Sequence, residues 1–123
     1  MKKILIVEDD EPVRKMLARL LRGKERDLCM AGTGQEALDA IRVQRPDLIL
    51  LDFFLPDMVA VTFMSQIKNM YPAIPIIIVS NFWNMEYAKL AAQQGAVDFI
   101  PKPIDPQQLV EIVNIRLSEG TAA

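Results

Sequence analysis

Four short apolar runs constrain the fold of this chain more than any other feature. They are rich in valine, isoleucine and leucine and lack regular polar alternation: Ile4–Val7, Leu48–Leu51, Ile76–Val79 and Val97–Ile100. Such runs are typical of strands buried on both faces of a parallel sheet. The carboxyl ends of parallel strands lie at one edge, where ligands of open α/β sheets bind. The residues that follow the runs are therefore candidates for one common site.

Each run is followed by a polar residue that a phosphoryl-transfer site would need. Glu8 and Asp9 follow the first run, and the next three runs lead to Asp52, Ser80 and Lys102. An aspartate carboxylate can attack a phosphoryl group, Mg²⁺ prefers oxygen ligands, and a lysine can neutralise charge on phosphoryl oxygens. Three carboxylates in one place would repel one another until a divalent cation binds.

Each of these residues also has an ordinary structural interpretation. The first acids could cap a helix, the aspartates around Pro56 could form a turn, and Lys102 between two prolines could be a solvated loop residue. Their joint occurrence after four strands favours a site.

Helical patterns with one apolar face alternate with the strands. In the first of them the basic residues, Arg14 among them, lie on a face expected to be solvated, and a weak second strand is expected at Leu28–Ala31. The alternation amounts to five β-then-α units and predicts a doubly wound parallel α/β fold. One domain then covers residues 1–123, with a core of about residues 3–117 and a short, frayed tail.

Particular residue types predict where the helices begin and end. Helix N-caps are expected at Asp10, at Thr33 in a capping box with Glu36, and at Asp105. Prolines and a glycine are expected to end helices: Pro46, Pro72 and Gly95.

Composition limits the classes of function. With 14 basic and 16 acidic residues the net charge is −2, which is not the footprint of a nucleic-acid-binding domain. No apolar stretch approaches a membrane span and no signal-peptide pattern is present, so a cytoplasmic protein without a membrane partner is expected. Cys29 is the only cysteine and there is no histidine, which excludes an internal disulfide and histidine-based catalysis. A phosphohistidine donor would have to belong to another protein.

Four motifs, in order, carry a specific resemblance: Ile-Val-Glu-Asp-Asp, Leu-Leu-Asp-Phe-Phe-Leu-Pro-Asp-Met, Ile-Val-Ser and Gln-Gly-Ala-Val-Asp-Phe-Ile-Pro-Lys-Pro. From Lys3 to about Leu117 the chain resembles the receiver domain of two-component response regulators. The resemblance implies a flavodoxin-like five-stranded sheet with strand order 2-1-3-4-5.

The resemblance also implies roles for individual residues. Asp52 would be the phosphoacceptor, Ser80 would hydrogen-bond a phosphoryl oxygen, and Lys102 would neutralise its charge. A cis peptide bond is implied between Lys102 and Pro103. The implied Mg²⁺ ligands are Glu8, Asp9, Asp52 and the backbone carbonyl of Phe54.

A signalling role follows from the same resemblance. The phosphodonor would be a sensor histidine kinase or a histidine phosphotransfer protein, and the domain would catalyse only its own phosphorylation and slow dephosphorylation. Ser80 and Phe99 would then switch the surface formed by the fourth helix, fifth strand and fifth helix. That surface would contact an effector or a second copy of the chain. Because Phe99 lacks a hydroxyl group, its ring is expected to favour the inward position.

Several residues depart from the family pattern. Val59 and Ala60 replace a usual Asp-Gly pair, so a remodelled loop is expected if that loop needs a positive φ. Phe54 and Phe82 could exclude water from an acyl phosphate, or Phe82 and Trp83 could form a partner patch. These departures keep open a second possibility, a docking module that is not phosphorylated.

A third possibility belongs to another class of protein. Residues 32–37 fit the G-x-G-x-x-A dinucleotide-binding fingerprint, and Asp52 follows at a suitable distance for a ribose contact. The strand that precedes the fingerprint is weak, however, and the capping box accounts for Gly34 without a ligand.

Overall fold

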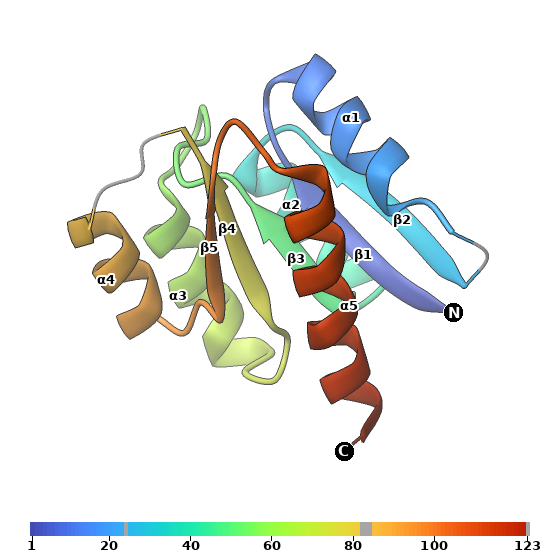
Figure 1. Cartoon of the computed structure of the whole chain (residues 1–123). Coiled ribbons are helices and arrows are strands. Elements are labelled where there is room, and N and C mark those ends of the chain that lie inside the picture. The colour runs from blue at the N-terminus through green and yellow to red at the C-terminus, as the bar shows by residue number, and fades with distance from the viewer. Residues whose placement is uncertain (24, 82–84, 123) are drawn as a thin grey trace.

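The computed structural model is a three-layered α/β domain that describes residues 1–23, 25–81 and 85–122, with side chains to residue 118 (Figure 1). Its elements are β1 (Lys2–Val7), α1 (Glu11–Leu21), β2 (Arg26–Ala31), α2 (Gly34–Val43), β3 (Leu48–Leu51), α3 (Ala60–Met70), β4 (Ile76–Ser80), α4 (Met85–Gln93), β5 (Asp98–Pro101) and α5 (Pro106–Ala122).

All neighbouring strands pair in parallel, in the order β2-β1-β3-β4-β5. The predicted doubly wound fold and its strand order are therefore confirmed. Val7 pairs with both Ala31 and Leu51, so the ends of the three strands on that side of the sheet are level. Ser80 pairs with Pro101, the residue before Lys102.

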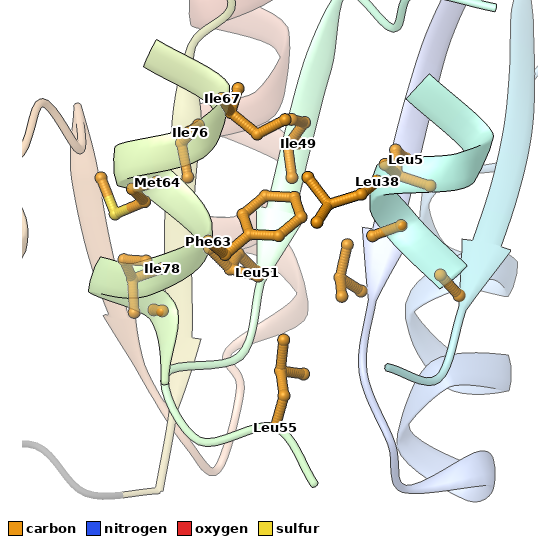
Figure 2. Close-up of a cluster of buried hydrophobic side chains, with 14 of the residues drawn as sticks. Leu5, Leu38, Ile49, Leu51, Leu55, Phe63, Met64, Ile67, Ile76 and Ile78 are labelled. Carbon is orange, nitrogen blue, oxygen red and sulfur yellow. The ribbon is translucent and has the colours of Figure 1, made fainter. Parts of the chain in front are cut away.

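Alternate residues of the central strands face two separate cores. Ile4 and Ile6 of β1 pack with α1 and α5, whereas Leu5 and Val7 pack on the face covered by α2, α3 and α4. Figure 2 shows Phe63 of α3 at the centre of the core on the face covered by α2, α3 and α4, with its ring between side chains of β3 and α2. Because both sheet faces are covered, the strands are apolar on both sides.

Three predicted N-caps form hydrogen bonds with their helices. The carboxylate of Asp10 accepts from Val13 N at 3.2 Å, and Thr33 Oγ1 accepts from Glu36 N at 3.1 Å. Asp105 Oδ1 accepts from the backbone of α5 in the same way. The second half of the expected capping box is different, because the Glu36 carboxylate accepts from the backbone of the preceding loop instead of the N-cap residue.

Gly95 ends α4 as predicted. Its φ of +104° is the one positive φ among the described residues. Gly95 N donates to Ala92 O and Ala96 N donates to Ala91 O, so the last carbonyls of the helix have partners. The helices α2 and α3 also end before the predicted prolines.

Several element boundaries differ from the sequence prediction: β1 begins two residues before the expected run, at Lys2, and β4 continues one residue past it, to Ser80. The strand β2 begins two residues earlier than expected, at Arg26, and β5 is shifted by one residue. The helix α5 continues past Leu117 to Ala122. No proline interrupts residues 118–122, so the hydrogen-bond pattern of the helix can continue.

None of the described helices combines the length and the apolar character needed to cross a membrane.

Candidate functional site

The sheet brings residues from distant parts of the sequence to its carboxyl edge. The backbone hydrogen bonding of the sheet continues one residue past β1 and β3, because Glu8 N donates to Ala31 O at 3.0 Å and Asp52 N donates to Val7 O at 3.0 Å. On the other side, Lys102 N donates to Ser80 O at 2.9 Å. The backbones that carry these side chains are thus held by the sheet itself, which limits their movement.

Glu8, Asp9 and Asp52 form a cluster of carboxylates. One oxygen of each lies within 4.8 Å of the others. The Glu8 side chain is 2% exposed and that of Asp52 is 12% exposed, whereas Asp9 is open to solvent. Several hard oxygen donors with an open side fit a Mg²⁺ ion, which keeps water ligands when it binds to proteins.

Lys102 lies within this acidic cluster. Its ammonium group forms an ion pair with the Glu8 carboxylate and lies 3.5 Å from Asp52 Oδ2. The lysine side chain is only 8% exposed, so these charges interact with little screening by water. The peptide bond between Lys102 and Pro103 is cis, as the family resemblance implies.

The environment of Glu8 disfavours its negative charge. Burial raises the pKa of Glu8, and the adjacent Asp52 carboxyl raises it further, while Lys102 acts in the opposite direction. A bound cation would relieve this crowding of carboxyl groups.

A cavity of 510 Å³ opens beside the carboxylates. Acidic groups and Lys102 form its polar part, and the aromatic residue Phe54 is also among its lining residues. The remaining lining residues are Asp10, Val13, Met16, Asn81, Pro103 and Ile104. The cavity can admit a phosphoryl group and part of its donor.

Two predicted switch residues lie near the site but outside the lining of this cavity. Ser80 is fully buried at the end of β4. Phe99 is half-buried and packs against the core on the α2, α3 and α4 side of the sheet. Its ring is thus not fully outward, and the expected inward preference stays a prediction.

Arg14 contacts the site, although its position in the sequence pattern predicts a solvated helix face. Arg14 Nη1 donates to the backbone carbonyl of Glu8 at 2.7 Å. The guanidinium therefore holds the peptide between the two acids that end β1 in a fixed orientation. The only signal in the sequence is a basic residue in the first turn of the helix that follows the acids, which is common on solvated helices.

Asp57 connects the loop after β3 with the beginning of α2. Its carboxylate accepts from Gly34 N at 2.8 Å and from Gln35 N at 3.0 Å, and these hydrogen bonds lower the pKa of Asp57. The side chain of Met58 fills the space where a Cβ of Gly34 would lie, at 2.5 Å. The peptide N–H groups that would bind a pyrophosphate are thus used internally, which counts against the dinucleotide alternative.

The loop with Val59 and Ala60 needs no positive φ. Ala60 is the first residue of α3, and its backbone N donates to Phe53 O at 2.7 Å. Phe54 and Val59 form an antiparallel bridge across the loop. Since no described residue other than Gly95 has a positive φ, the alanine is accommodated without backbone strain.

Of the aromatic residues that depart from the family pattern, the structure describes Phe54 but not Phe82 or Trp83. Phe54 lines the cavity. Phe82 and Trp83, predicted to exclude water or to form a partner patch, lie outside the described residues.

Three acids, a hydroxyl residue and a lysine thus meet at the carboxyl edge of a parallel α/β sheet with strand order 2-1-3-4-5. The family model of the response regulator receiver domain matches residues 4–114. The chain therefore belongs to the response regulator receiver domain family.

Curated relatives agree with this assignment. The chain is 36% identical over 113 residues to the DNA-binding transcriptional regulator NtrC of Klebsiella pneumoniae, which covers 92% of the chain and 24% of NtrC. It is 36% identical over 115 residues to the DNA-binding response regulator MtrA of Mycobacterium leprae, covering 94% of the chain and 51% of MtrA. The chain thus spans between a quarter and a half of the length of these relatives.

Solved structures show the same fold. A CheY-like receiver domain protein from Methanospirillum hungatei superposes with a TM-score of 0.93 at 28% identity, covering 99% of this chain and 98% of the other. The receiver domain of NtrX from Brucella abortus superposes with a TM-score of 0.87 at 30% identity, covering 94% and 98%.

Proposed function

We propose that this domain accepts a phosphoryl group on Asp52 from a phosphohistidine of a sensor kinase or phosphotransfer protein. The observation that carries the proposal is the cluster of three carboxylates within 4.8 Å, with Lys102 3.5 Å from Asp52. A solvated surface would not hold a lysine with a side chain only 8% exposed between two acids.

The chemistry follows from these groups. An oxygen of Asp52 attacks the phosphorus, the bond from phosphorus to the donor nitrogen breaks, and its electron pair stays on the imidazole. A Mg²⁺ ion held by Glu8, Asp9, Asp52 and the carbonyl of Phe54 would neutralise charge on the phosphoryl oxygens. Lys102 moves from the carboxylate toward a phosphoryl oxygen and stabilises the charge that remains.

The proposed output is a changed surface. Ser80 hydrogen-bonds the phosphoryl group, Phe99 turns inward, and the surface formed by α4, β5 and α5 changes for an effector or for a second copy of the chain. The relatives named above are described as DNA-binding regulators, and the matched part covers only a fraction of them. The effector would accordingly be another domain or protein, with no direct contact between this domain and nucleic acid.

Incubation with acetyl phosphate, with and without Mg²⁺, tests the proposal. Intact mass spectrometry is expected to show one phosphoryl adduct with Mg²⁺ and none after chelation with EDTA, and peptide mapping is expected to place the adduct on Asp52. If Mg²⁺ binds and no adduct forms, the docking-module alternative would replace this proposal.

Replacement of Lys102 by methionine is expected to slow adduct formation by a factor on the order of 10²–10³. The variant keeps the length of the side chain but removes the charge that faces Asp52. Rates of phosphorylation by acetyl phosphate would be compared with those of Lys15→Met, in which an exposed lysine of α1 is changed. Equal rates in both variants would show that Lys102 has no part in the transfer.

Replacement of Phe54 by asparagine is expected to shorten the life of the phosphorylated form severalfold. Phe54 lines the cavity that contains Asp52, so a small polar side chain in its place would admit water to the acyl phosphate. The decay of the adduct can be followed by mass after removal of the donor. Tyr71→Asn serves as the control, because Tyr71 packs on the same core and is not among the residues that line the cavity; an unchanged decay in Phe54→Asn would disprove water exclusion by this residue.

A further inference from the structure

Three aromatic rings connect the loop after Asp52 to α4. Phe53 and Tyr87 stack with ring centroids 5.0 Å apart and an interplanar angle of 28°. Phe54 meets Tyr87 edge-on at 5.5 Å and 78°, and Phe53 and Phe54 are themselves 4.9 Å apart. Each ring thus contacts both others, at separations typical of favourable aromatic pairs.

The three rings have different surroundings. Phe53 is 3% exposed and belongs to the core on the α2, α3 and α4 side of the sheet. Tyr87 and Phe54 are half-buried and pack against that core, but only Phe54 also lines the cavity that contains Asp52. Tyr87 therefore contacts the ring of a residue that lines the cavity, without itself lining this cavity.

Packing of the Tyr87 ring against the Phe54 ring restricts the movement of the Phe54 side chain. Backbone bonds fix the position of the Phe54 main chain, since it bridges to Val59 across the loop. The ring of Phe54 can still rotate about its side-chain bonds, and an edge-to-face neighbour limits that rotation. Loss of the Tyr87 ring would remove one of the aromatic contacts that restrict the Phe54 ring.

We propose that Tyr87 is a positioning residue that holds the Phe54 ring beside Asp52 and so slows hydrolysis of the aspartyl phosphate. This inference rests on the proposed function. In the hydrolysis a water oxygen attacks phosphorus, the bond from phosphorus to the Asp52 oxygen breaks, and the carboxylate keeps the electron pair. The proton of the water leaves with inorganic phosphate and solvent. The ring acts by limiting the access of that water.

The expected result is that the phosphorylated form of Tyr87→Leu decays about threefold to tenfold faster than that of the wild type, which corresponds to the loss of an aromatic pair. Leucine retains most of the buried apolar volume, so the fold is preserved, and Tyr87→Ala provides a second variant. Tyr87→Phe keeps the ring and should retain the wild-type decay. Tyr71→Leu is the matched control. Tyr71 packs on the same core, but it lies at the C-terminal end of α3, whereas the loop after Asp52 leads into the N-terminal end of that helix.

A double variant separates positioning from a general loss of stability. If Tyr87 acts through Phe54, then Phe54→Ala with Tyr87→Leu should decay no faster than Phe54→Ala alone. If the two substitutions accelerate decay independently, so that their effects on the decay rate multiply in the double variant, the inference is overturned. It is also overturned if Tyr87→Leu forms the adduct normally and loses it at the wild-type rate. If the wild type forms no adduct at all, the proposed function fails, and this inference fails with it.

Discussion

The variant Asp52→Asn is expected to form no phosphoryl adduct with acetyl phosphate and Mg²⁺. Its amide has no anionic oxygen with which to attack phosphorus, and the substitution removes one of the three carboxylates that lie within 4.8 Å. Intact mass spectrometry under the conditions that fully phosphorylate the wild type measures this effect. Mg²⁺ binding is expected to weaken in the same variant, because a hard cation loses a charged oxygen donor.

Loss of folding would not explain that result. Burial and the Asp52 carboxyl both raise the pKa of Glu8, so removal of the Asp52 charge relieves repulsion within the cluster. The free energy of unfolding should thus equal or exceed that of the wild type. The control is Asp39→Asn, which alters an exposed carboxylate of α2 that accepts from Gln35 Nε2. An adduct on Asp52→Asn equal to that on this control would rule out Asp52 as the phosphoacceptor.

Replacement of Phe63 by alanine is expected to lower the free energy of unfolding by about 3–5 kcal/mol. The ring is fully buried and lies between β3, α2 and α3, so its loss leaves a cavity that neighbouring side chains cannot close (Figure 2). Urea denaturation followed by circular dichroism measures the change. The effect is a large fraction of the stability of a domain of this size.

An exposed side chain provides the comparison for that experiment. Val43 in α2 is 88% exposed, and Val43→Ala is expected to change the free energy of unfolding by less than about 0.5 kcal/mol. If Phe63→Ala were as stable as Val43→Ala, the core on this side of the sheet would be packed differently from the structure described above.

Most of the fold could be predicted from the sequence, because the signals are local. Continuous apolar runs predicted doubly covered strands, and side-chain caps such as Asp10 and Thr33 marked helix starts that the structure reproduces. The length of α5 was missed because a helix can continue through weak residues when no proline stops it. The beginning of β2 was missed because an edge strand is only partly buried and has a weak apolar pattern.

The candidate site was predictable in part for the same reason. A parallel sheet places the carboxyl ends of its strands together, so residues that end strands, such as Asp52 and Lys102, could be expected to meet. Contacts that these residues form with side chains of other helices and loops could not be predicted in this way. Neither the hydrogen bond from Arg14 to Glu8 O nor the two that Asp57 accepts from α2 follows a spacing rule, because each depends on where a loop crosses a helix.

The sequence by itself determined the class of fold and the identity of the charged groups at the edge of the sheet, because burial and strand ends are encoded in local patterns of apolar and polar residues. Only the tertiary structure decided which groups touch. It placed Lys102 between Glu8 and Asp52 and set the ring of Tyr87 against Phe54. Such contacts join segments far apart in the chain, and their geometry is fixed by the packing of whole elements.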